Sequence, residues 1–124
     1  MKVTLPIVTK DEIINKKRVT EYGEKAFNFD VSLGCQKRWE AKFPDNAERE
    51  GIVDYVERLK DEKRTSMPVI ISKLKAIYCF FDTDMSFMAF LQMFDFTNAE
   101  YTKNLINKIN ELFEVVFDGA SEKN

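Results

Sequence analysis

Apolar residues recur at the spacing of an α-helix along three segments of the chain, and this repetition limits the fold more than any other feature. In the first segment, residues 52–59, they stand at positions i, i+3, i+4 and i+7. Such a stripe is buried against a neighbouring element, while charged residues cover the opposite side. The sequence therefore predicts a mainly α, compact multi-helix domain. The three stripes are Ile52, Tyr55, Val56 and Leu59; Ile70, Leu74, Ile77, Tyr78 and Phe81; and Tyr101, Leu105, Ile109, Leu112 and Val116.

Residues that typically start or stop helices separate these segments. Ser32 can cap a helix that runs to about Lys42, and Pro44 prevents its continuation. Pro68 suits the first turn of a helix that starts after Ser66 or Met67. The remaining signals are Asp45 with Glu48, Asp84 before a short helix over 85–94, Thr97 with Glu100 before a helix over 98–117, and Gly119 as a left-handed stop.

The N-terminal residues show the weakest helical pattern. Residues 2–8 are β-prone, but Pro6 cannot donate a hydrogen bond to a strand ladder, so we expect an edge strand or an extended arm. Thr9 and Glu12 fit a capping box and predict a short helix over residues 9–20.

Phe27, Phe29 and Val31 alternate with polar residues, which favours a strand or an extended lead-in to the next helix. We therefore expect a short extended or β-prone N-terminal segment ahead of the helices. The predicted division is an N-terminal arm or short helix/strand segment over 1–26, an α-helical domain over 27–118 and a flexible tail over 119–124.

Charge and hydropathy exclude several classes of protein. The 124 residues carry a net charge of −2, and lysines and arginines alternate with acids. Nucleic-acid binding needs a clustered positive field, so we expect no nucleic acid among the partners. No apolar run approaches the length of a membrane span, and no signal peptide is recognisable, so we expect a cytoplasmic protein without a membrane partner.

The sequence contains few residues in arrangements typical of catalytic or metal sites. Histidine is absent, which removes the commonest general base, the usual zinc ligand and every Ser–His or Cys–His pair. Cys35 and Cys79 lack zinc-site spacing, and we expect two free, mostly buried thiols, although the first turn of a helix can activate Cys35. The run DTD at 82–84 lacks the other ligands of a calcium site, and no glycine-rich phosphate loop occurs. We predict no enzyme, cofactor, metal or small-molecule substrate.

The segment FFDTDMSFMAFLQMFDF, residues 80–96, is rich in Phe and Met. Its apolar side chains occupy more than one side of a short helix, so the domain itself or a partner must bury them. Complete internal burial is one interpretation. The other is a protein-binding surface, because Met and Phe adapt their shape and bury a large area. The predicted surface for a partner or for self-association comprises Met85, Phe87, Met88, Phe90, Leu91, Met93 and Phe94.

The only tryptophan, Trp39, lies in the stretch GCQKRWEAKFP. On a short helix Trp39 and Phe43 share one face and pack inward, while the neighbouring charged residues Lys37, Arg38, Glu40 and Lys42 face water. The predicted structural anchors are Trp39, Phe43, Leu74 and Tyr78.

Five segments in a fixed order resemble one protein family. They read LGCQKRWEAKFP, EREGIVDYVERL, SKLKAIYCFF, FMAFLQMFDF and LINKINELFEVVF, within a match that runs from about Phe27 to the C terminus. The most specific pieces are RWEAKFP and KLKAIYCFF, in that order and at this separation. In these segments the chain resembles the tail assembly chaperones of long-tailed bacteriophages and prophages, in particular those of Gram-positive hosts.

The resemblance implies a mainly α-helical protein that is absent from the finished virion. Such chaperones coat the tape measure protein, keep it soluble and help recruit the tail tube protein. The implied partners are therefore the tape measure protein and the tail tube protein, the implied state is a homo-oligomer, and the implied location is the bacterial host cytoplasm. Many members also have a longer form made by ribosomal frameshifting, and A-rich codons that allow slippage can encode Lys123 and Asn124.

Three alternatives stay open at this point. A small regulatory or interaction protein of a phage or prophage, acting on a host or phage protein, would share the acidic, helical character. A transcriptional module would need a basic recognition helix, and no helix here has one without interleaved acids. A small enzyme would need a reactive Cys35.

Overall fold

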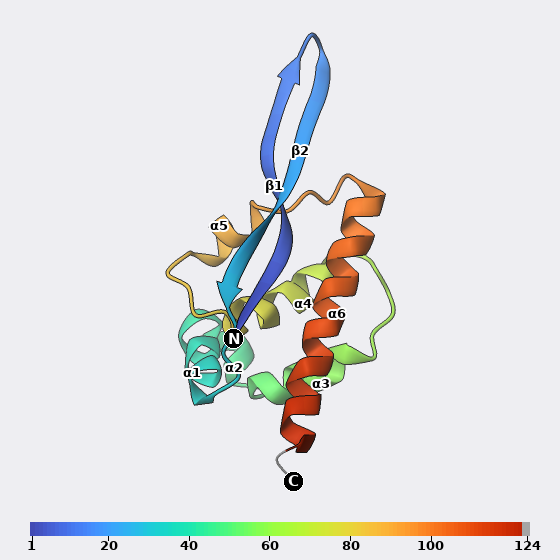
Figure 1. The fold of residues 1–124 in the computed structure, drawn as a ribbon. Coiled ribbons are helices and arrows are strands. Elements are labelled where there is room, and N and C mark those ends of the chain that lie inside the picture. The colour runs from blue at the N-terminus through green and yellow to red at the C-terminus, as the bar shows by residue number, and fades with distance from the viewer. Residues whose placement is uncertain (123–124) are drawn as a thin grey trace.

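The computed structural model describes residues 1–122 and the side chains of residues 1–117. Its N-terminal part is an antiparallel hairpin of β1 (Lys2–Ile14) and β2 (Lys17–Asn28), whose closed end projects beyond the helical body (Figure 1). The predicted helix over residues 9–20 is therefore wrong.

The turn of the hairpin explains this difference. Ile14 pairs with Lys17 across two residues, Asn15 and Lys16, whose φ angles are 52° and 65°. Two successive positive φ angles are typical of a type I′ turn, whose twist matches that of two paired strands. Asn tolerates this conformation well, and the long pairing on either side of the turn outweighs the local capping pattern at Thr9.

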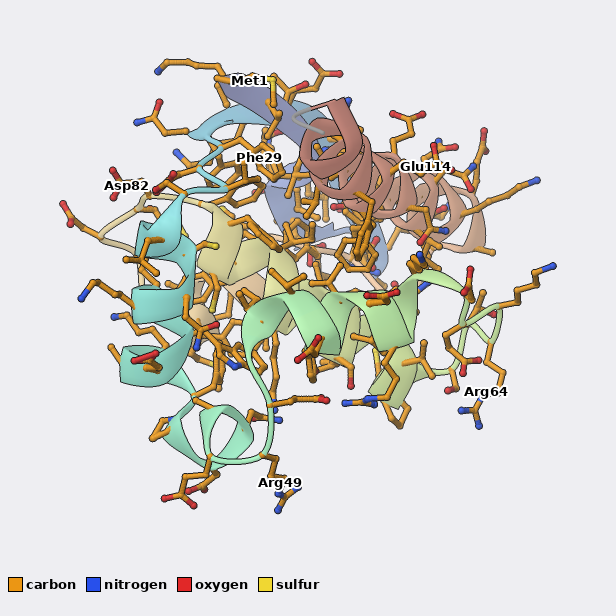
Figure 2. All side chains as sticks on the ribbon, turned by 90° about the horizontal axis from the view of Figure 1, so that it is seen from below. Met1, Phe29, Arg49, Arg64, Asp82 and Glu114 are labelled. Carbon is orange, nitrogen blue, oxygen red and sulfur yellow. The ribbon has the colours of Figure 1, made fainter. Side chains whose placement is uncertain are left out.

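Six helices follow within residues 1–122, so the prediction of a mainly α fold is confirmed. The central helix, α4, contacts α1, α3, α5 and α6. Figure 2 shows Phe29 inside this body, while Arg49, Arg64 and Glu114 lie at its outside. The helices are α1 (Leu33–Lys42), α2 (Pro44–Ala47), α3 (Ile52–Lys60), α4 (Met67–Phe80), α5 (Phe87–Leu91) and α6 (Ala99–Glu122).

The three predicted apolar stripes form the core. Each of their residues is buried, and one continuous cluster joins them to residues of the hairpin and of α1. Leu5 and Phe27 enter this cluster from β1 and β2, so the lower half of the hairpin is part of the body. None of the helices in the described residues is long and apolar enough to cross a bilayer.

The predicted starts of α1 and α4 are confirmed. The hydroxyl oxygen of Ser32 accepts a hydrogen bond from the Gly34 backbone N–H, and α1 ends at Lys42. Ser66 precedes α4, and Pro68 lies in its first turn, where the missing N–H costs nothing.

The predicted start of α3 is wrong. The pair Asp45 and Glu48 does not cap it, because Pro44 starts the short helix α2 and places Asp45 in the first turn of that helix. Gly51 is the residue before α3 instead, and its side-chain-free backbone fits against Gln36, where an added Cβ would lie 3.2 Å from Oε1.

The predicted cap of α6 shifts by one residue. Asn98 Oδ1 accepts from the Tyr101 backbone N–H at 3.0 Å, while the Thr97 hydroxyl is bonded elsewhere. The helix also includes Gly119, which is therefore not the residue at which it stops. Lys123 and Asn124, which carry the predicted frameshift codons, lie outside the described residues.

We expect Lys16→Gly to strengthen the turn of the hairpin. A non-glycine residue in the left-handed region costs about 1–2 kcal/mol, and the extra freedom of an unfolded glycine offsets about 0.5–1 kcal/mol of the gain. The net gain of about 0.5–1 kcal/mol should therefore slow amide hydrogen exchange of residues 10–18 about two- to fivefold. The matched variant Lys17→Gly, in regular strand, should speed exchange, and equal acceleration by both variants would contradict the turn assignment.

Candidate partner-binding surfaces

The segment around α5 is shorter and more irregular than its sequence predicts. Ser86, not Asp84, caps α5, because its hydroxyl oxygen accepts from the Ala89 backbone N–H at 3.1 Å. The helix ends after Leu91, so the residues that follow it leave the helical register.

The seven residues predicted as a partner surface divide into three groups. Phe90 and Phe94 are buried in the core, with 0% and 7% of their area exposed, so their placement on a surface is wrong for the folded monomer. Met88 is 64% exposed. The other four pack against the core and keep a partly exposed side: Met85, Phe87, Leu91 and Met93. We call these four residues and Met88 the α5 surface.

Phe90 is buried because five aromatic rings surround it. Its nearest ring is that of Phe94, with centroids 5.0 Å apart in an edge-to-face arrangement. Offset and edge-to-face aromatic pairs add about 0.5–1.5 kcal/mol beyond the area they bury. The rings within 6.4 Å of Phe90 are those of Phe27, Tyr78, Phe81, Phe87 and Phe94.

Three of the four predicted structural anchors are buried, and the fourth packs against them. Trp39 is fully buried, its Nε1–H donates to the Glu50 carbonyl at 3.0 Å, and Leu74 and Tyr78 are also in the core. Phe43 is partly buried and packs against both Trp39 and Tyr78.

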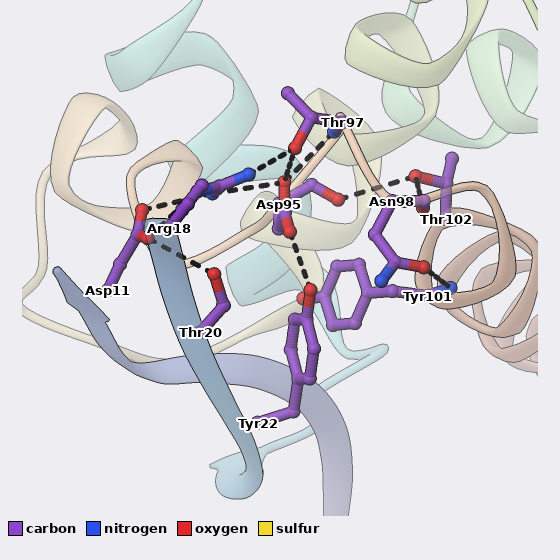
Figure 3. A network of polar contacts seen from close by, with 9 residues as sticks. All are labelled: Asp11, Arg18, Thr20, Tyr22, Asp95, Thr97, Asn98, Tyr101 and Thr102. Carbon is purple, nitrogen blue, oxygen red and sulfur yellow. Dashed lines mark hydrogen bonds and ion pairs between the residues drawn. The ribbon is translucent and has the colours of Figure 1, made fainter. Parts of the chain in front are cut away.

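Sequence reasoning missed a buried aspartate that ties the hairpin to the helical body. Asp95, 4% exposed, lies between α5 and α6. Its Oδ1 accepts from the Thr97 backbone and hydroxyl groups, and its Oδ2 accepts from the Tyr22 hydroxyl at 2.6 Å (Figure 3). Arg18 of β2 approaches Oδ1 at 3.4 Å and also forms a two-pronged pair with Asp11 of β1. We call these five residues the hairpin latch.

Burial alone would raise the pKa of Asp95, but the hydrogen bonds from Thr97 and Tyr22 and the charge of Arg18 outweigh it and lower the pKa to about 2. A local signal existed in the sequence, because Asp followed two residues later by Thr suits a turn closed by the aspartate side chain. Its contact with residues more than 70 positions away had no such signal.

A second contact holds the same part of the hairpin. The Tyr101 hydroxyl donates to the Pro6 carbonyl at 2.6 Å, and the Tyr101 ring stacks on Tyr22 with centroids 4.8 Å apart. The Val8 backbone N–H donates to the Met93 carbonyl at 2.8 Å. These contacts cover the outer edge of β1 up to Val8.

Beyond Val8 the hairpin leaves the body. The strand pairing shifts at Thr9, because Val8 pairs with Tyr22 and Lys10 pairs with Glu21, which leaves Thr9 as a β-bulge. The Thr9 side chain lies beside Gly23, where an added Cβ would lie 2.8 Å from the Thr9 methyl group. Bulges increase the twist of a strand pair and change its direction. We call residues 10–18 the hairpin tip. No other strand in the described residues pairs with either of its edges.

The hairpin tip carries exposed apolar residues among charges. Ile13 is 78% exposed and Ile14 is 45% exposed, between acidic residues on β1 and basic residues on the turn and β2. Free strand edges with exposed β-branched residues are templates for pairing with another chain, and interspersed charges are a common protection against unselective pairing.

The thiols are free and buried, as the sequence predicts. Burial raises the pKa of Cys35, against the lowering effect of Arg38, and raises the pKa of Cys79 to about 12. A reactive thiol needs a lowered pKa, and burial has the opposite effect on Cys35. Among the residues that the structure describes, no three potential ligands of the His, Cys, Asp or Glu type gather into a metal site.

Two variants test whether Phe90 is a core residue and Met88 an exposed one. Phe90→Ala should lower the free energy of unfolding by about 3–5 kcal/mol, because a fully buried aromatic side chain is lost and leaves a cavity. Met88→Ala should change it by less than about 0.5 kcal/mol. Urea unfolding followed by Trp39 fluorescence measures both, and similar losses for the two variants would contradict the assignment.

Asp95→Asn should weaken folding in a pH-dependent way. The folded pKa of about 2 lies below the ordinary value of 3.8, so ionised Asp95 stabilises the fold above pH 4, and this contribution disappears as pH falls through 2. The variant should lose about 1–3 kcal/mol of unfolding free energy at pH 6 and little at pH 2.

The control for this pH series is Asp82→Asn, which changes an exposed aspartate in the connection between α4 and α5. Thermal unfolding at each pH provides the comparison. A difference between wild type and Asp95→Asn that stays constant from pH 6 to pH 2 would contradict the charged latch.

No protein-family model matches the chain, and searches of curated proteins and of solved structures find no match either.

Proposed function

We propose that this chain is a tail assembly chaperone of a long-tailed phage or prophage. In this function it binds the tape measure protein during tail assembly, helps recruit the tail tube protein, and is not retained in the virion. The observation that carries the proposal is the hairpin tip. Apart from Arg18, whose side chain reaches back to Asp95 and Thr97, the tip stands clear of the helical body, and it has two exposed isoleucines and two edges that no other described strand pairs with.

A free strand edge binds another chain through backbone hydrogen bonds, which every sequence can supply, while side-chain pockets add selectivity. This mode suits a chaperone for a long client, because many different segments must be covered by copies of the same protein. A tape measure protein has apolar stretches that aggregate when they are left bare. The exposed Ile13 and Ile14 add apolar contact at the same place.

The latch supports the same function because it fixes where the tip stands. Asp95, Tyr22 and Arg18 hold the ribbon at the point where it leaves the body. A pre-positioned strand pair loses less conformational entropy on binding than a disordered segment does. The tip of one copy can therefore reach either a client segment or a neighbouring copy, as coating of a long client by a homo-oligomer requires.

The α5 surface is the second candidate contact for the client. Met88 is exposed, and its partly exposed neighbours are mostly Met and Leu, which adapt to differing shapes. It lies on the helical body and is therefore separable from the tip by mutation.

The test co-expresses the chain with the tape measure protein encoded in the same genome and measures the soluble tape measure protein and its co-purification. Wild type should raise the soluble fraction. The double variant Ile13→Lys, Ile14→Lys should weaken binding by about tenfold or more, since each buried isoleucine contributes about 1.5–3 kcal/mol.

Leu33→Lys is the matched control, because Leu33 is 71% exposed on α1, away from the tip. Met88→Lys probes the α5 surface. If Met88→Lys abolishes binding while the tip variant binds normally, the client contact is α5. If wild type neither binds nor solubilises the tape measure protein, the chaperone function is wrong, and an interaction with another host or phage protein takes its place.

A further inference from the structure

A groove runs along α6 beside the connection between α3 and α4. Two adjoining cavities of about 600 Å³ and 530 Å³ form it, and both are lined by Thr65, Ile106 and Asn107. In Figure 1 the α3–α4 connection passes alongside α6. Phe96, Ile106, Phe113 and Phe117 give the groove its apolar lining. We call it the α6 groove.

The wall of the α6 groove contains a buried cation. Lys73 of α4 is 3% exposed, and its Nζ donates to the Glu62 carbonyl and to Asn110 Oδ1, each at 3.0 Å. Both acceptors are neutral. No carboxylate oxygen of the described residues lies within 4.0 Å of this ammonium group, since the Glu62 carboxylate pairs with Arg64.

A buried lysine without a charged partner is rare, because an ammonium group loses its hydration on burial. An ammonium group has three N–H donors, and the two hydrogen bonds above use two of them. Burial lowers the pKa of Lys73, against a smaller raising effect of Glu62, which agrees with incomplete compensation of the charge. The third N–H has no acceptor among the described residues, and Lys73 lines the cavity of about 600 Å³.

The rim of the groove is positively charged, like Lys73. Five cations and three carboxylates line the two cavities, a net charge of +2 in a chain whose net charge is −2. Lys63 and Lys103 are exposed there and form no ion pair within the described part of the chain. Asp61 and Glu114 are on the rim as well, so a partner there needs mixed charges with an excess of acid.

We propose that the α6 groove binds an amphipathic helix of a partner protein, with its apolar face against the groove and one Asp or Glu carboxylate on Lys73. The lining of α6 from Ala99 to Phe117 spans about 27 Å, enough for about five helical turns. Side chains at i, i+3 or i+4, and i+7 then meet the apolar lining. An extended peptide fits less well, because neither α6 nor the connection offers a strand edge to pair its backbone.

This site is independent of the proposed function. It rests on α6, on Lys73 of α4 and on the α3–α4 connection, whereas the proposed client contact rests on the hairpin tip. Loss of one by mutation should therefore leave the other intact.

The first experiment selects ligands from a displayed library of 18-residue helical peptides on the wild-type protein, with counter-selection on Asn107→Trp. Asn107 is exposed and lines both cavities, so a tryptophan there fills the groove. Selected peptides should share an apolar stripe and an acidic residue at one fixed position of it. Peptides without a fixed acidic position, or peptides that bind Asn107→Trp equally well, would overturn the proposal.

The second experiment measures the contact with Lys73 by fluorescence anisotropy of the best selected peptide. Lys73→Met should weaken binding by tenfold or more, and so should replacing the fixed Glu of the peptide by Gln. Combining the two changes should weaken binding little further, because both remove the same pair. Additive losses would show that the carboxylate does not contact Lys73.

Matched controls come from the same helices. Lys75→Met removes a cation of α4 that lies over the Phe43 ring instead of the groove. Asn104→Trp places the same large ring on α6 outside both cavities. Both controls should bind the selected peptide as wild type does, and a loss as large as that of Lys73→Met or Asn107→Trp would overturn the assignment of the groove.

Discussion

The packing of aromatic rings around Phe90 is the interaction on which the rest of the structure depends. Phe27, at the end of β2, stacks on Phe81 with centroids 4.5 Å apart, and both rings contact Phe90 from the segment after α4. A backbone hydrogen bond joins the same elements, because the Asp30 backbone N–H donates to the Phe80 carbonyl at 2.7 Å. Strand, central helix and α5 therefore meet at one buried point, and the hairpin has a fixed base.

From that base, polar contacts decide the direction of the ribbon. A two-stranded hairpin alone is at best marginally stable in water, so contacts with the helical body must stabilise this one. Leu5 and Phe27 bury the base of the hairpin in the core, and the latch around Asp95 holds the strands where they leave the body. The bulge at Thr9 then turns the tip away from the body, where its edges are free for another chain.

Sequence periodicity predicted the helical core because each stripe repeats over several turns, as in Leu105, Ile109 and Leu112. The helix predicted for residues 9–20 is wrong because the capping pattern behind it covers only four residues, whereas the strand pairing covers the whole ribbon. For the predicted partner surface, composition identified the segment but not which of its residues face the core and which face outward. The short α5 turns Phe90 inward and Met88 outward, and only three-dimensional packing decides this. The latch and the Lys73 groove join residues distant in sequence, so no local pattern contains them.

The most direct test of the account is hydrogen–deuterium exchange of this chain with and without the tape measure protein from the same genome. The account predicts that amides of residues 10–18 gain protection in the complex, because free strand edges become paired. The amides of α4 and of residues 99–117, already inside the folded body, should change little. Binding without any added protection in the hairpin tip would contradict the account.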